Sequence, residues 1–137
     1  MYAKLATTQL RSRKDSDVAL PQVNYTKKYC LVGAGPAGLV MARALIKEGI
    51  PFDWYERNGN VGGIWDMDNP DTPMYDSCHF ISSKYTSGFY GFPMPQEYPD
   101  YPSWDQIRDY IRDFADKYDL KRRVTFGVSV NQAEPLS

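Results

Sequence analysis

One short stretch decides the fold expected of this 137-residue chain: Tyr29-Cys30-Leu31-Val32-Gly33-Ala34-Gly35-Pro36-Ala37-Gly38-Leu39. Its first four residues form a nearly continuous apolar run, which is typical of a buried parallel strand. After the glycine turn, apolar residues recur at helical spacing: Leu39, Val40, Ala42, Leu45 and Ile46. The stretch therefore predicts a strand, a tight turn and a helix.

The chain beyond this helix predicts a second strand that ends in a carboxylate. Gly49 suits the end of the helix, and residues 51–55 are suited to a strand that leads to Glu56. Glu56 lies 23 residues beyond Gly33. A glycine motif between strand and helix, followed at this distance by an acidic residue, is typical of a dinucleotide-binding unit. An ordinary glycine turn is the alternative.

Each glycine of the motif has a distinct expected role. Gly33 permits the tight turn, Gly35 lets a pyrophosphate approach the backbone, and Gly38 lets the helix pack against the strand. The free N–H groups at the start of the helix attract phosphate. Glu56 is placed to accept hydrogen bonds from an adenosine ribose, which disfavours a 2′-phosphate and leaves FAD or NAD as the ligand of this unit.

A second glycine motif follows within nine residues of Glu56, in the segment Glu56-Arg57-Asn58-Gly59-Asn60-Val61-Gly62-Gly63-Ile64-Trp65. Paired glycines let a backbone come close to a ligand, and Trp65 can pack on that ligand. A Gly-Gly hairpin turn beside a core tryptophan is the alternative. The motif thus indicates a second cofactor contact or a plain turn.

The remaining segments predict a long irregular stretch and a third strand. Residues 57–102 are rich in Gly, Pro and aromatic residues, and long ordered loops of this kind are usually functional. A helix is expected from residue 104, where Ser103 and Gln106 have the spacing of a capping box. Residues 124–130 alternate like a strand. Residues 1–28 are expected to be a flexible basic arm.

Composition excludes several classes of protein. The chain has 17 acidic and 16 basic residues and a net charge of −1, which argues against nucleic acid as a partner. No apolar run is long enough for a membrane span. The two cysteines argue against a disulfide framework and make the cytoplasm the expected location. A single histidine offers no metal site.

Taken together, these motifs resemble the FAD-binding N-terminus of the flavin-containing monooxygenases. The resemblance rests on residues 33–39, on Glu56-Arg57 and on Gly62-Gly63-Ile64-Trp65. It continues through Ser82-Ser83-Lys84, residues 91–95 and residues 100–103. It covers residues 29–131 and implies an α/β, Rossmann-type FAD-binding domain of the two-dinucleotide flavoprotein kind, apparently incomplete, over residues 29–137. In that family, the three strands are expected in the order 2-1-3.

The resemblance also implies a set of cofactor contacts. The residues expected at the FAD pyrophosphate are Gly33, Gly35, Pro36, Ala37 and Gly38. Glu56 would hold the adenosine ribose, Arg57 would lie beside the adenine, and the strand near Val130 would pass the adenine by its backbone. Gly62, Gly63 and Trp65 would line the flavin side. No catalytic residue is assigned.

The function implied by the resemblance is that of an NADPH-dependent monooxygenase. In this family a flavin C4a-hydroperoxide, formed with O2, oxygenates a small substrate: a nucleophilic nitrogen or sulfur compound or, in related enzymes, a ketone. The chain departs from the family at Ile81, where many members carry Asn. It also lacks the second glycine motif, which would bind NADPH. The expected partner is therefore the rest of the enzyme or a complementary chain. Another FAD oxidoreductase and a non-catalytic truncated or split subunit are the alternatives.

Overall fold

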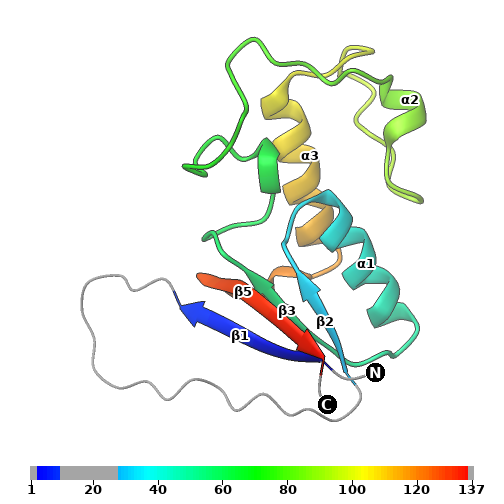
Figure 1. Ribbon diagram of the computed structural model, residues 1–137. Coiled ribbons are helices and arrows are strands. Elements are labelled where there is room, and N and C mark those ends of the chain that lie inside the picture. Colours follow the sequence, from blue (N-terminus) through cyan, green and yellow to red (C-terminus); the bar gives the residue numbers. More distant parts are fainter. Residues whose placement is uncertain (1–2, 10–27, 136–137) are drawn as a thin grey trace.

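Residues 3–9 and 28–135 are described by the computed structural model of the chain (Figure 1). The elements are, in chain order, β1 Ala3–Gln9, β2 Tyr29–Val32, α1 Pro36–Lys47, β3 Phe52–Glu56, the 3-10 turn η1 Gly63–Trp65, α2 Lys84–Ser87, α3 Trp104–Lys117, the 3-10 turn η2 Lys121–Arg123, β4 Thr125–Phe126 and β5 Val128–Pro135. The predicted strand–helix–strand unit is confirmed as β2, α1 and β3.

Three parallel strands form the sheet that carries α1. Its order is β2-β3-β4, with Tyr29 opposite Phe52 and Tyr55 opposite Thr125. The expected order 2-1-3 is wrong, because the third strand pairs with the second and not with the first. α3 packs against η1, the next element after β3. Because this contact places α3 near β3, the chain that leaves α3 reaches the free edge of β3.

The predicted strand over residues 124–130 is divided in the structure. Gly127 has a φ of +69° between β4 and β5, a left-handed conformation that breaks the strand. β5 then turns away and pairs antiparallel with β1, from Val128 opposite Gln9 to Pro135 opposite Ala3. Residues 3–9, expected to be part of an arm without regular structure, therefore form a strand. Residues 10–27 of that arm lie outside the described residues.

Strand β2 is less buried than its apolar sequence predicts. The exposed fractions of Tyr29 and Val32 are 63% and 58%, and Cys30, expected in the core, is also exposed. β2 is an edge strand of the three-stranded sheet, and a parallel strand is buried only when both of its faces are covered. The expectation of a buried strand is thus wrong for this part of the sheet as it stands.

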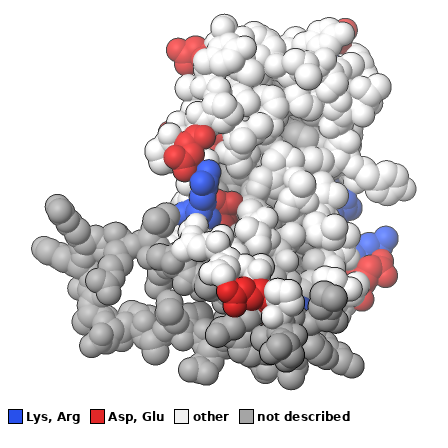
Figure 2. Space-filling view, viewed as in Figure 1, with Lys and Arg blue, Asp and Glu red and all other residues white. Residues whose placement is uncertain are grey.

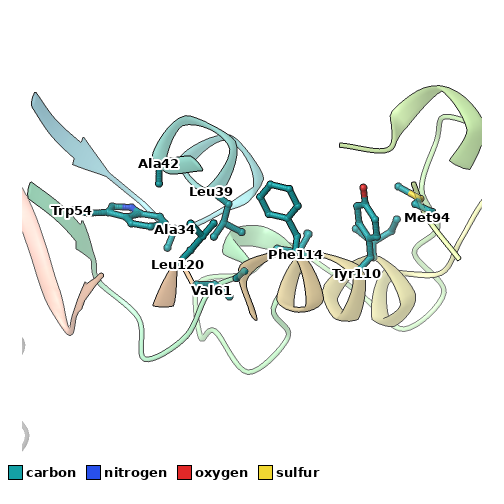
Figure 3. Close-up of a cluster of buried hydrophobic side chains, with 12 residues drawn as sticks. Ala34, Leu39, Ala42, Trp54, Val61, Met94, Tyr110, Phe114 and Leu120 are labelled. Atoms are coloured by element: carbon teal, nitrogen blue, oxygen red, sulfur yellow. The ribbon is translucent and has the colours of Figure 1, made fainter. Parts of the chain in front are cut away.

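The core lies between α1, β3 and α3 (Figure 3). Trp54 of β3, Leu39 of α1 and Phe114 of α3 are almost fully buried in it. Phe114 lies 4.5 Å from the ring centre of Phe89, so the aromatic residues of the long irregular segment extend the core toward α2. This packing holds the segment on the helices.

Helix α3 begins as the sequence predicts. The side chain of Gln106 accepts a hydrogen bond from the backbone N–H of Ser103 at 3.0 Å, which is one half of a capping box. On the face shown in Figure 2, positive and negative side chains lie in small groups beside each other and form no broad basic patch. In the described residues, no helix has the length and apolar character needed to cross a membrane.

Candidate functional site

The glycine turn between β2 and α1 is closed by two hydrogen bonds between Gly33 and β3. The N–H of Gly33 donates to Tyr55 O at 2.8 Å, and the indole Nε1–H of Trp54 donates to Gly33 O at 2.8 Å. Gly33 has a φ of +93°, which favours glycine. A Cβ on Gly38 would lie 2.1 Å from Gly33 O, so the first turn of α1 is in contact with the turn itself.

The start of α1 has free backbone donors. The first N–H groups of a helix have no partner within that helix. Here the N-cap is Gly35, which offers no side chain to cap them, and no acidic residue lies in the first turn. The partial positive charge of the helix end is therefore left for an anionic ligand. The structure confirms the position that the sequence predicted for residues 33–38, between a strand and the start of a helix.

The second glycine motif packs directly on the first. The N–H of Gly62 donates to Ala34 O at 3.1 Å. A Cβ on Gly63, whose φ is +60°, would lie 2.9 Å from the Cα of Gly35. Only glycine allows so close an approach of the two backbones. The segments around Gly35 and Gly63, far apart in sequence, thus form one glycine-lined surface, which we call the glycine cradle (residues 33–38 and 62–63).

The buried side chain of Glu56 stabilises the glycine turn by hydrogen bonds. The residue is 5% exposed, and its carboxylate accepts hydrogen bonds from Ala34 N at 2.6 Å and from Asn58 N at 2.8 Å. Each oxygen of a carboxylate can accept more than one hydrogen bond, so the group keeps acceptor capacity. The sequence singled out Glu56 for a ribose; the structure shows in addition that it fixes the turn.

Glu56→Gln is expected to destabilise the chain by about 2 kcal/mol, the usual worth of a hydrogen bond to a charged group. The amide is nearly isosteric, but its NH2 group would face one of the two backbone N–H groups. Urea unfolding followed by circular dichroism measures the change. Glu134→Gln, at an exposed residue of β5, is the control and is expected to leave the unfolding free energy unchanged.

A buried ion pair that the sequence did not reveal secures the second glycine motif. Arg112 of α3 donates through Nη2 to Asp66 Oδ1 at 3.0 Å, and the Asp66 side chain is only 7% exposed. Gly62 lies against Asp66, because a Cβ on it would come within 3.1 Å of Asp66 Cβ. α3 therefore helps to hold the cradle. No sequence spacing links residues that lie 46 positions apart.

The other residues singled out from the sequence lie at varying places. Trp65 packs edge-on to Phe80 at 5.4 Å, beside the second glycine motif. Arg57 is exposed and pairs with Asp71 at 3.2 Å. Val130 lies in β5 opposite Thr7, and the contacts that join the cradle do not include it. The structure thus brings the glycines of both motifs and Glu56 together. Arg57 and Val130 lie outside this group of contacts.

The loop over residues 88–92 is held next to α1 by residues that the sequence did not single out. The hydroxyl of Tyr110 accepts from Phe89 N at 2.6 Å and donates to Phe92 O at 2.5 Å. Burial raises the pKa of Tyr110, so the phenol keeps the proton that it donates. Arg43 donates to Tyr90 O at 2.8 Å. Phe89 then lines an apolar groove of about 430 Å³ with Pro36, Ala37, Val40, Met41 and Ala44.

Comparison with known protein families gives one match over most of the chain. The model of the family described as "Flavin-binding monooxygenase-like" matches residues 26–135. Among curated proteins, a dimethylaniline monooxygenase [N-oxide-forming] 2 of Pan troglodytes and the flavin-containing monooxygenase 2 of Homo sapiens are each 32% identical over 108 residues. Those residues make up 76% of this chain and 20% of each relative. The chain therefore spans about a fifth of their length.

Solved structures of the same kind share the fold. The S-allyl-L-cysteine S-oxygenase from Allium sativum matches with a TM-score of 0.65 and 25% identity, over 73% of this chain and 27% of that one. A steroid monooxygenase bound to NADP matches with a TM-score of 0.59 and 26% identity, over 73% of this chain and 19% of that one. The chain thus shares the α/β fold of one part of these monooxygenases.

Proposed function

Because the chain belongs to the flavin-binding monooxygenase-like family, we propose that it is the FAD-binding portion of a flavin monooxygenase. The glycine cradle is the observation that carries this proposal. A Cβ at Gly38 or Gly63 would collide with backbone at 2.1 Å or 2.9 Å, so only glycine at these two positions lets α1, the turn and the second glycine motif meet without side chains between them. The unpaired N–H groups at the start of α1 suit a pyrophosphate. The residues present therefore fit FAD.

In this proposal the glycine cradle and the residues around it each contact one part of the cofactor. The pyrophosphate is bound by Gly33, Gly35, Pro36, Ala37 and Gly38. Glu56 accepts hydrogen bonds from the adenosine ribose, Arg57 and the backbone near Val130 lie beside the adenine, and the flavin side is lined by Gly62, Gly63 and Trp65. Packing of Trp65 on Phe80 gives that side a rigid apolar wall.

When bound and reduced by NADPH, the flavin would supply the chemistry that activates O2 and transfers one oxygen atom to the substrate. The residues of this chain bind and orient the cofactor and exclude water from it. We propose NADPH binding by a region outside this chain. The substrate class is a small nitrogen or sulfur nucleophile or a ketone, consistent with the N-oxide-forming and S-oxygenase names of the relatives.

Gly35→Ala is the variant that tests FAD binding apart from folding. The new Cβ would lie 3.5 Å from Gly63 Cα, an ordinary contact, and the φ of Gly35 is −76°, which alanine adopts readily. We expect unfolding free energy to change by less than about 1 kcal/mol, as for a substitution without strain. We expect FAD affinity to fall at least tenfold, because the methyl group blocks the pyrophosphate.

The measurement is a titration of the purified chain with FAD, followed by quenching of flavin fluorescence. Gly59→Ala is the matched control, since a Cβ there would meet nothing within 4 Å. Wild-type chain that remains without flavin at saturating FAD contradicts the proposal. Equal FAD affinity of the wild type and Gly35→Ala contradicts the assignment of the pyrophosphate to Gly35.

We also propose that the rest of the enzyme, or a complementary chain, covers the open side of the sheet. Tyr29 and Val32 of β2 and Val40 and Met41 of α1 are all exposed. A helix that is apolar on more than one face is normally buried on more than one face. The proposed location is the cytoplasm, consistent with Cys30 and Cys78 being free thiols.

A further inference from the structure

Lys84 is a buried cation without a charged partner. Lys84 is the first residue of α2 and is only 8% exposed. The ammonium donates to Gln96 O at 2.7 Å and to Tyr98 O. Within residues 28–135, no carboxylate lies at ion-pair distance from it. A buried charge is costly unless it is paired, and two neutral carbonyls and the Tyr85 ring, whose centre lies 5.2 Å from Nζ, compensate it only in part.

This lysine lines a cavity of the size that small ligands occupy. The cavity measures about 530 Å³ and is lined by Lys84, Tyr85, Gly88, Phe89, Gly91, Pro93, Met94 and Gln96. Ligand sites typically have volumes of about 300–1,000 Å³ and combine apolar walls with a few polar groups. Phe89 and Met94 form apolar wall here, and among the described residues of the lining Lys84 is the only Lys, Arg, Asp or Glu.

The cavity lies next to the glycine cradle. Phe89 also lines the apolar groove that begins at Pro36 and Ala37, the first residues of α1. Tyr110 fixes Phe89 in this place by the hydrogen bond to its N–H. A molecule in the cavity is therefore separated by one aromatic side chain from the groove beside the proposed cofactor site.

From these contacts we infer that the cavity binds a small organic carboxylate, with the carboxylate at Lys84 and an apolar body against Phe89 and Met94. An ammonium has three N–H donors, and the two carbonyls take two of them. A carboxylate on the third donor would supply the missing counter-charge. The further step, that this molecule is the substrate, rests on the proposed monooxygenase function. The binding of the carboxylate is independent of that function.

The test compares two probes of one shape on the 137-residue chain: 3-phenylpropanoate and the neutral 3-phenylpropanamide. We expect the carboxylate to bind at least tenfold more tightly by isothermal titration calorimetry, with amide NMR shifts concentrated at Gly88 and Gly91. Lys84→Met is expected to abolish the difference. Lys121→Met, at a lysine paired with Asp116 on the surface, is expected to keep it.

Several outcomes would overturn the inference. One is equal affinity of the wild type for the two probes. Another is that the amide NMR shifts lie away from residues 84–96. A third is that inorganic phosphate binds as tightly as the carboxylate. The comparison in the wild type decides the matter even where Lys84→Met does not fold. FAD binding is scored separately by fluorescence, so a chain that binds FAD and no carboxylate contradicts this inference alone. A chain that binds the carboxylate and no FAD contradicts the proposed function alone.

Discussion

Gly38→Ala is expected to lower the free energy of unfolding by about 3 kcal/mol and to abolish measurable FAD binding. Helix propensity alone favours alanine by about 1 kcal/mol at an ordinary helical position. At Gly38 the new Cβ would lie 2.1 Å from Gly33 O, a rigid backbone atom that the Trp54 indole also holds. The collision outweighs the propensity, because α1 must shift away from the turn to relieve it.

Urea unfolding and FAD titration together measure this effect. Gly59→Ala makes the same chemical change where a Cβ meets nothing within 4 Å, and it is expected to change neither quantity. A Gly38→Ala chain as stable as the wild type would show that the turn can yield. The close approach of helix and turn would then be no requirement of the fold.

Asp66→Ala is expected to destabilise the chain by about 3 kcal/mol, the low end for breaking a buried ion pair, because Arg112 keeps a second, longer pair with Asp68 at 3.8 Å. Arg112 would lose its 3.0 Å hydrogen bond to Asp66, and its Nε already lacks a hydrogen-bond partner in the described residues. Gly62, which packs on Asp66, would lose its support. FAD affinity is therefore expected to fall at least tenfold as well.

The matched control is Asp109→Ala, which breaks the pair of Arg108 with a half-exposed carboxylate at 2.8 Å. Exposed pairs contribute about 0–1 kcal/mol, so the control is expected to unfold nearly as the wild type does. Thermal and urea unfolding check both variants. If Asp66→Ala and Asp109→Ala prove equally mild, the pair with Arg112 does not support the cradle.

The local part of the site could be predicted from the sequence, because it depends on neighbours along the chain. The spacing of the glycines and of Glu56 predicts the turn, the start of the helix and the place of the carboxylate. The positive φ at Gly33, which favours glycine, agrees with the predicted turn. Asp66 and Arg112 could not be found in this way. Each is an ordinary charged residue in its own segment, and only the docking of α3 brings them to 3.0 Å.

The errors about the sheet have a common physical origin. Strand order and burial depend on what covers an edge, and periodicity carries no information about that. The run from Tyr29 to Val32 predicts a buried strand, yet β2 has an open edge. The alternation of residues 124–130 is real, but the left-handed Gly127 divides it between two sheets.

The pairing of Asp66 with Arg112 also bears on how the chain folds. The pair joins residues 46 positions apart, and the contact of Gly35 with Gly63 likewise closes a long loop. Such non-local contacts form only after the entropy of loop closure has been overcome. We therefore expect the cradle to be completed only when α3 docks. A cofactor that needs the completed cradle binds the native state alone, and the stabilisation it gives rises with the logarithm of its free concentration once that exceeds the Kd.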